Sequence, residues 1–243
     1  MTDIKQLLKE FERFANGQHL HAAFSELLDW TLLPFKIWDS AEQQSQALET
    51  YKTHPKVSQL VSLITLIGDL SEGFSDPIGE LYMQAISNGH NGQYFTPEPI
   101  CGMISAMTIG EGVESRETIC DPACGSGRML LAAAKQTRHS MFYGADLDGT
   151  CCKMALVNML LNSLQGEIAH MNTLSNELYA GYKVSTILID GYHMPYYTEF
   201  TEPEQSYIWL KPNQKAQPTP AFNTPFEPVK ASHPINGVQG VLF

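Results

Sequence analysis

Two closely spaced glycines follow an acidic residue in the middle of the chain. The segment DPACGSGRMLL begins with Asp121 at the end of an apolar run and places Gly125 and Gly127 before a helix-like stretch. Glycines remove side chains where backbone N–H groups at a helix start can face a ligand. A dinucleotide-binding turn would have a third glycine where this chain has Leu130. An acidic residue suits an ammonium-bearing ligand better than a pyrophosphate. The alternative to a ligand site is a plain strand-to-helix turn.

Two further segments accompany this turn. Asp146 ends the apolar run MFYGAD, and its two carboxylate oxygens can accept hydrogen bonds from both ribose hydroxyls of an adenosine. The alternative for Asp146 is a loop-capping aspartate. Upstream, Tyr94 and Phe95 directly precede a helix start at Thr96 and Pro97. These aromatics can be ordinary core residues, but a sulfonium cation also gains from an aromatic face. The presence of all three segments favours a ligand site over a plain turn.

Four segments in this order resemble the motifs of a known family. They are DPIGELYMQAI, GQYFTP, DPACGSGRMLL and YGADLD. They are similar to the adenine-specific DNA methyltransferases that form the modification subunits of type I restriction–modification systems. The resemblance covers roughly residues 1–197. It implies a helical N-terminal domain followed by a Rossmann-like domain that uses S-adenosylmethionine as its cofactor.

The resemblance also implies which residues hold the cofactor. The implied contacts are Tyr94, Phe95, Thr96 and Pro97 at the methionine part, Asp121, Ala123 and Gly125 at its amino-acid end, and Asp146 at the ribose. The family has an aspartate near the cofactor's adenine, where the matching stretch IAHMNTL offers Asn172. The amide oxygen of Asn172 can still accept a hydrogen bond from an exocyclic amine.

The catalytic segment departs from the family pattern. Family members use an Asn- or Asp-Pro-Pro-aromatic turn, whose side-chain oxygen and first proline carbonyl accept the amine hydrogens of a flipped adenine. This chain has ILIDGYHMPYYTEF, in which Asp190 ends the strand while Gly191 and Tyr192 replace both prolines. The predicted catalytic residues are Asp190 as acceptor and Tyr192 or Tyr196 as the stacking ring. A structural turn without catalysis is the alternative.

The net charge of −11 argues against strong DNA binding by this chain alone. A protein that holds duplex DNA by itself shows a basic face, and the acidity here is spread over both halves. A DNA adenine methyltransferase that works with a separate specificity subunit is therefore the first hypothesis. The second is a catalytically degenerate methyltransferase-fold protein that binds the cofactor as a regulator or complex component.

The chain divides into three regions by pattern. We expect a helical domain over residues 1–90, a methyltransferase domain over 91–210 and a proline-rich tail over 211–243. Apolar runs alternate with helical segments in the middle region, which is typical of an α/β fold with a parallel sheet and crossover helices. The predicted strands are 117–121, 141–146, 166–170 and 184–190, with a fifth in SYIWL (206–210), and the predicted helices between them are 126–137 and 150–164.

The N-terminal region shows apolar residues at helical spacing in three stretches. A polar run over 40–50 separates the second from the third, and a short helix follows with Asp76 as its cap and Pro77 in first position. The predicted sheet is short for this family, so its exposed edge must be covered by the tail or by another copy of the chain.

The remaining features concern location and metals. No run of 18 apolar residues occurs, and the amphipathic start is unlike a secretory signal, so we expect a cytoplasmic protein without a membrane partner. Cys120 and Cys124 are separated by three residues, not the two of a zinc knuckle. We therefore expect reduced thiols and no metal site.

Overall fold

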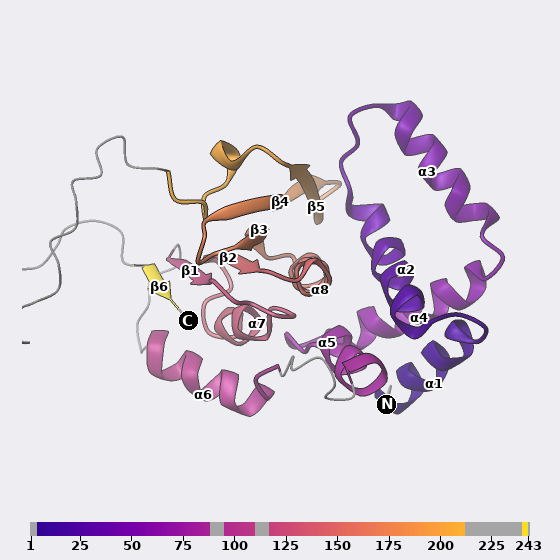
Figure 1. The fold of residues 1–243 in the computed structure, drawn as a ribbon, viewed down its shortest axis with the longest axis horizontal. Coiled ribbons are helices and arrows are strands. Elements are labelled where there is room, and N and C mark those ends of the chain that lie inside the picture. Colours follow the sequence, from indigo (N-terminus) through magenta and orange to yellow (C-terminus); the bar gives the residue numbers. More distant parts are fainter. Residues whose placement is uncertain (1–3, 88–94, 110–116, 212–239, 243) are drawn as a thin grey trace, which may run out of the picture.

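The computed structural model describes residues 4–87, 95–109, 117–211 and 240–242. A group of helices from the N-terminal region lies beside a twisted sheet whose lower face carries further helices (Figure 1). The described parts therefore form the α/β architecture expected from the sequence, with helices preceding the sheet.

The sheet has six strands in the order β5-β4-β3-β2-β1-β6. The parallel strands are β1 (Thr118–Asp121), β2 (Met141–Asp146), β3 (Gln165–Asn172) and β6 (Gly240–Leu242). The first three confirm the predicted strands at these positions. Because parallel strands point the same way, Asp121, Asp146 and Asn172 end at one edge of the sheet. β6 comes from the predicted tail and covers the outer edge of β1.

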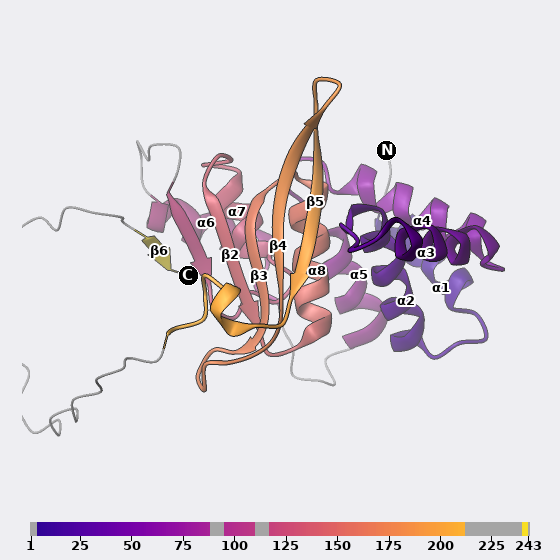
Figure 2. The same cartoon turned by 90° about the horizontal axis from the view of Figure 1, so that it is seen from above.

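The fourth strand runs in the direction opposite to the predicted one. β4 (Glu177–Ile189) is antiparallel to β3 and forms a hairpin with β5 (Tyr192–Phe200), which extends beyond the other strands (Figure 2). Four residues separate β3 from β4, whereas a parallel return needs a crossover of about a dozen or more. Asp190 and Gly191 form the hairpin turn, both with positive φ (50° and 84°), as a type I′ turn requires.

A second difference from the prediction is that residues 206–210 do not form a strand. The Ser206 hydroxyl donates to Glu167 Oε1 over 2.5 Å and accepts the backbone N–H groups of Ile208 and Trp209, both at 3.1 Å. Such a local side-chain bond competes with strand pairing and keeps the segment turned. The Trp209 indole N–H donates to the Asn176 carbonyl over 2.9 Å, so the segment is attached to the start of β4.

Helices cover the sheet face that carries the glycine turn. α7 (Arg128–Ala134) and α8 (Gly149–Leu161) are the two predicted crossover helices, each shorter than expected. α6 (Glu98–Ile109) packs against α7, as Figure 1 shows. Gly127 caps α7 in the left-handed conformation with φ of 85°, which favours glycine at this position.

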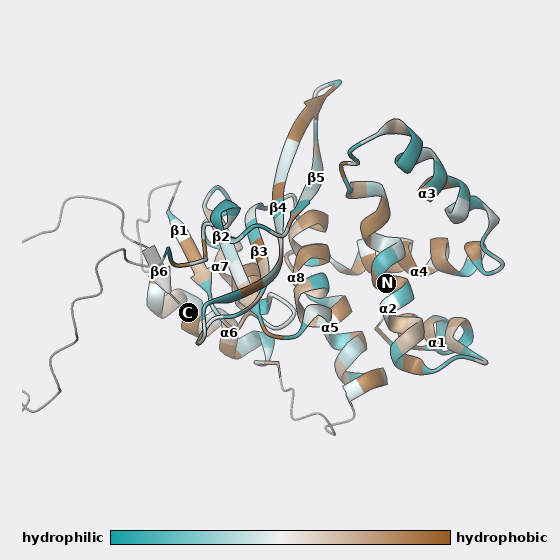
Figure 3. Ribbon diagram, turned by 45° about the horizontal axis from the view of Figure 1, so that its top comes forward, coloured by the Kyte–Doolittle hydropathy of each residue, from teal (hydrophilic) through white to brown (hydrophobic). Residues whose placement is uncertain are grey.

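The helical region contains α1 (Ile4–Ala15), α2 (Leu20–Leu32), α3 (Ala41–Thr53), α4 (Val57–Leu70) and α5 (Pro77–Tyr82), with single turns at η1 (Leu33–Phe35) and η2 (Met83–Ser87) and later at η3 (Pro203–Gln205). The polar run over 40–50 is mostly helix α3. It has no buried residue and is largely hydrophilic (Figure 3), so no apolar period marked it. Its start is capped by Ser40, whose hydroxyl accepts the Gln43 N–H at 3.2 Å.

One hydrophobic core joins the helical region to the sheet. It runs from Phe11 and Phe24 in α1 and α2, through Leu156 in α8, to Phe142 in β2. The domain boundaries at residues 90 and 210 stay a prediction. Among the residues that the structure describes, no helix combines the length and apolar content that crossing a membrane requires.

Candidate cofactor-binding site

A cavity of about 260 Å³ lies at the carboxyl ends of β1 and β2. Its wall brings together six residues predicted to contact the cofactor: Phe95, Thr96, Asp121, Ala123, Gly125 and Asp146. Pro97 lines a neighbouring cavity that shares Phe95 and Arg128 with the first. Tyr94 lies outside the described residues. Segments from three separate parts of the sequence thus meet at one edge of the sheet.

The glycine turn is shaped by positive φ angles and close neighbours. Gly125 has φ of 53°, and a Cβ built there would lie 3.0 Å from the Phe95 ring. A Cβ at Gly127 would lie 3.2 Å from that of Ala155 on α8. Larger residues would therefore both strain the backbone and displace a neighbour. The turn brings its backbone close to the aromatic wall of the cavity.

Asp146 fixes the turn with both carboxylate oxygens. Its Oδ2 accepts the Gly125 N–H at 2.8 Å and its Oδ1 accepts the Asp148 N–H at 2.9 Å. Each carboxylate oxygen has a second acceptor site. The side chain is partly exposed, so both oxygens keep capacity for two hydroxyl donors of a ligand.

Asp121 is a buried carboxyl in the cavity wall, exposed by only 6%. Burial raises its pKa to about 6, and the nearby charge of Asp146 acts in the same direction. The Ala123 N–H, which donates to its Oδ1 over 3.1 Å, opposes that rise in pKa. A cationic ligand group would stabilise the ionised form and bring the pKa back down.

The raised pKa of Asp121 predicts a pH-dependent affinity for S-adenosylmethionine. The expected partner of the ligand's ammonium group is ionised Asp121, which in the free protein is protonated below pH 6. The affinity should therefore fall about tenfold between pH 7 and pH 5, where the α-amino group of the ligand stays charged. Calorimetry across this range measures it. Asp121→Asn keeps the Ala123 contact but should bind the ligand weakly at every pH. If its affinity fell with pH as steeply as that of the wild type, Asp121 would not be the partner of the ammonium group.

A buried network behind the turn was missed by sequence reasoning, which assigned Asp76 only as a helix cap. Asp76 accepts the Gly79 N–H and the Asn158 amide on one oxygen, both at 2.7 Å. Its other oxygen accepts from Ser126 Oγ at 2.5 Å and Arg128 Nε at 2.7 Å. Burial raises the pKa of Asp76, whereas Arg128 and these hydrogen bonds lower it. No local signal could reveal partners 50 to 82 residues away.

Aromatic rings line the side of the site next to the helical region. Phe95 stacks on Tyr82 with ring centroids 5.8 Å apart and planes 28° apart. Tyr82 in turn lies 5.3 Å from the Phe24 ring of α2. The helical region therefore holds the Phe95 ring in place against Gly125.

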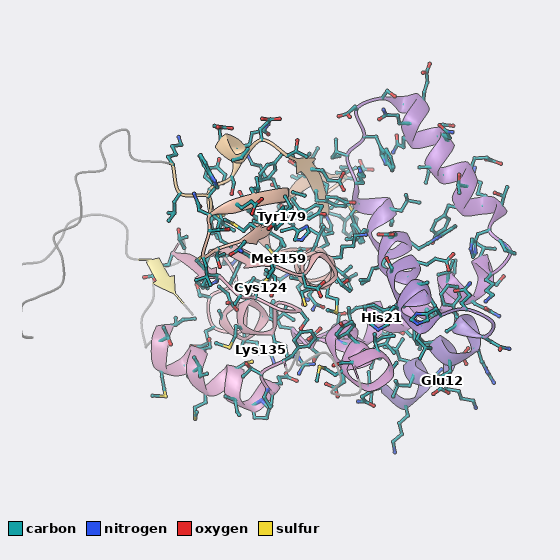
Figure 4. All side chains as sticks on the ribbon, viewed as in Figure 1. Glu12, His21, Cys124, Lys135, Met159 and Tyr179 are labelled. Carbon is teal, nitrogen blue, oxygen red and sulfur yellow. The ribbon has the colours of Figure 1, made fainter. Side chains whose placement is uncertain are left out.

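Cysteines surround the turn but are not reactive groups. Cys124, labelled in Figure 4, lies between the sheet and α7 and lines the cavity. Burial raises the pKa of Cys124 well above that of a free thiol, and burial also raises that of Cys151. Because the thiolate is the nucleophile, these groups are chemically inert at neutral pH. All five cysteines are free thiols.

The predicted catalytic residues do not reach this cavity. Asp190 occupies the hairpin turn, and Tyr192 next to it is 73% exposed. Because β4 is antiparallel, it ends at the sheet edge opposite to that of Asp121 and Asp146. Tyr196 on β5 pairs with Ser185 of β4 and lies toward this same far edge. The position expected for the catalytic acceptor is therefore not reproduced in this fold.

Asn172 ends β3 at the correct edge but does not line the cavity. Its Oδ1 accepts the N–H groups of Leu174 and Ser175 at 3.1 and 3.2 Å. Its amide oxygen thus closes the turn between β3 and β4. A role at the cofactor's adenine stays a prediction.

Solved structures with related shapes are distant. A type I restriction–modification methyltransferase subunit from Streptococcus thermophilus is 12% identical with a TM-score of 0.38, covering 67% of this chain and 57% of that one. A protein described as a class I S-adenosylmethionine-dependent methyltransferase from Listeria monocytogenes is 18% identical with a TM-score of 0.42, covering 68% and 52%.

Curated relatives are methylase subunits of type I restriction enzymes. The EcoKI subunit of Escherichia coli strain K12 is 26% identical over an alignment of 153 residues, and the match covers 51% of this chain and 28% of that subunit. The StySPI subunit of Salmonella potsdam is 27% identical over 154 residues, again 51% and 28%. The matched part is thus little more than a quarter of these relatives' length. Residues 74–216 match the family model described as N-6 DNA Methylase, so the chain belongs to the N-6 DNA methylase family.

Proposed function

We propose that this chain binds S-adenosylmethionine and forms the cofactor-binding part of an adenine-specific DNA methyltransferase of the type I restriction–modification kind. The observation that carries the proposal is the cavity in which Asp121 and Asp146 flank the glycine turn beside Phe95. Membership of the N-6 DNA methylase family supports adenine as the methylated base.

The residues present fit this cofactor chemically. Asp121 offers a carboxylate to an ammonium group, Asp146 offers two acceptors to ribose hydroxyls, and the Phe95 ring offers its face to a sulfonium. When bound, the cofactor supplies a methyl group activated by the positive sulfur. At about 260 Å³ the cavity is smaller than most ligand sites, so part of the ligand would extend outside it.

The chain would need other groups to hold the adenine. No Pro-Pro pair occurs in its sequence, and Asp190 lies at the opposite edge of the sheet. These observations also favour a second candidate function, a cofactor-binding component that does not itself transfer the methyl group. Under both candidates, methylation of DNA by the assembled system requires groups beyond the residues that the structure describes.

A partner is further supported by charge and by an exposed apolar surface. DNA binding by a chain with net charge −11 would rely on a separate specificity subunit. The hairpin tip exposes half or more of each of the following side chains: Ile187, Leu188, Ile189, Tyr192 and Met194. Such patches mark protein contacts, either with that subunit or with a second copy along β5. The cytoplasmic location expected from the sequence would give the chain access to DNA.

Calorimetry with S-adenosylmethionine tests the proposed cofactor. The wild-type chain should bind it, and Asp146→Ala should weaken binding at least about tenfold, because hydrogen bonds to a charged group contribute roughly 1.5–3 kcal/mol each. Asp190→Ala removes a carboxylate from the hairpin tip and is the matched control, with unchanged affinity. No detectable binding by the wild type at millimolar cofactor would overturn the proposal.

A further inference from the structure

Arg128 is the one cationic side chain among the described residues that line the cofactor cavity. It is the first residue of α7, and its side chain is 12% exposed. A nearly buried guanidinium keeps its charge and must satisfy it locally. Two acids at the start of α5 do part of this, since Nε donates to the cap residue Asp76 over 2.7 Å and Nη2 donates to Glu80 over 3.1 Å.

These two contacts hold the guanidinium but do not use all of its donors. Arginine presents five N–H groups in a planar fork. Nη1, which carries two of them, has no partner among the residues that the structure describes. The guanidinium carbon also lies 5.9 Å from the centroid of the Phe95 ring. Among the described residues, Asp76 and Glu80 thus fix the fork and leave one nitrogen without a partner, on a residue that lines the cavity.

The opposite charges of this cavity match an amino-acid group. The amino-acid end of S-adenosylmethionine carries an ammonium and a carboxylate on one carbon atom. Asp121, the buried acid of the cavity, suits the ammonium. We infer, resting on the proposed function, that Nη1 of Arg128 binds the carboxylate, and that this contact makes the site selective for ligands with a complete amino-acid group. Charge-assisted bonds of guanidinium to carboxylate are among the stronger hydrogen bonds in proteins.

Asp76 is the positioning residue for this contact. It joins Arg128 to Ser126 of the glycine turn and to Asn158 of α8 through the hydrogen bonds described above. The charge of Asp76 raises the pKa of Arg128 in spite of its burial. Asp76 does not line the cofactor cavity, so it acts on the ligand only through Arg128 and the turn.

The test compares two ligands that differ only in the carboxylate: S-adenosylmethionine and decarboxylated S-adenosylmethionine. Calorimetry at pH 7 should show that the wild type prefers the complete ligand by about ten- to one-hundredfold. Arg128→Gln should lose this preference by weakening the complete ligand alone, with the decarboxylated ligand changed less than about twofold. Arg128→Lys should keep part of the preference. Arg138→Gln, at an exposed arginine outside this cavity, is the matched control and should keep all of it.

The possible failures are distinguishable. Binding of neither ligand by the wild type would overturn the proposed function itself. Equal binding of both ligands by the wild type would overturn only the role of Arg128. An equal loss of both ligands in Arg128→Gln would show a merely structural residue. If Arg128→Gln does not fold, the wild-type comparison and Arg128→Lys still decide. Unchanged affinities for both ligands in Arg128→Lys would count against the proposed contact between the guanidinium and the carboxylate.

Discussion

Asp76→Ala is expected to lower the free energy of unfolding by about 3–5 kcal/mol, as removal of one partner from a buried ion pair does. Among the described residues, the variant leaves Arg128 with the more exposed Glu80 as its one acidic partner. It also removes the acceptor for Ser126 and Asn158, two buried polar residues, and the cap of α5. Urea unfolding followed by circular dichroism measures the change.

The matched control is Glu49→Ala, which breaks the exposed Lys52–Glu49 pair. It should cost less than about 0.5 kcal/mol. The double variant Asp76→Ala/Arg128→Met should lose less unfolding free energy than the two single variants lose together, because it removes the charge that Asp76→Ala leaves unpaired. A loss below about 1 kcal/mol in Asp76→Ala, or additivity in the double variant, would contradict the role given to this pair.

The second large effect concerns methyl transfer. The isolated chain should methylate unmodified DNA about 10⁴-fold more slowly than a relative with the complete Asn/Asp-Pro-Pro-aromatic turn. Among the described residues that line the cavity, neither of the two acceptors that the complete turn offers to the adenine amine is present. Each loss should cost about 10²-fold if it resembles removal of one oxyanion-hole donor. Incorporation of labelled methyl groups at saturating cofactor measures the rate.

Asp190→Ala, a variant in the hairpin turn, tests in the same assay whether Asp190 takes part in methyl transfer. Asp190→Ala should leave the residual rate unchanged, because Asp190 lies in the β4–β5 turn at the opposite edge of the sheet from the cofactor cavity. Rapid turnover by the isolated wild type would refute the requirement for a partner. A further loss of activity in Asp190→Ala would show that the hairpin, and not only the cavity, handles the substrate.

Short-range patterns were sufficient for much of this protein. An apolar run that ends in an acid and two glycines predicted the turn at Asp121, and Asp76 before Pro77 predicted the start of α5. These features depend on residues that are neighbours in the chain, so they can be predicted from the order of the residues in the sequence. The common edge of Asp121 and Asp146 also follows from order, because consecutive parallel strands end on the same side.

The direction of β4 could have been predicted but was not. Asp190-Gly191 between apolar runs is a strong local hairpin signal, but the family motif expected at Asp190 outweighed it. The four-residue connection after Asn172, which excludes a parallel return, is visible only in the structure, because the predicted strands left 171–183 between them. Helix α3 shows no apolar period because it has no buried side chain, and it was not predicted. Ser40, whose hydroxyl caps the helix, is a local signal that could have indicated its start.

Other features depended on the tertiary structure. The four hydrogen bonds of Asp76 come from α5, the glycine turn, α7 and α8, and no local pattern pairs residue 76 with residue 158. The raised pKa of Asp121 likewise results from burial by packed elements. Sequence order therefore determined which groups end at the cavity edge, because strand direction orders them. Packing alone decided which charges meet inside it, because burial and long-range pairing arise only when the separate elements come together.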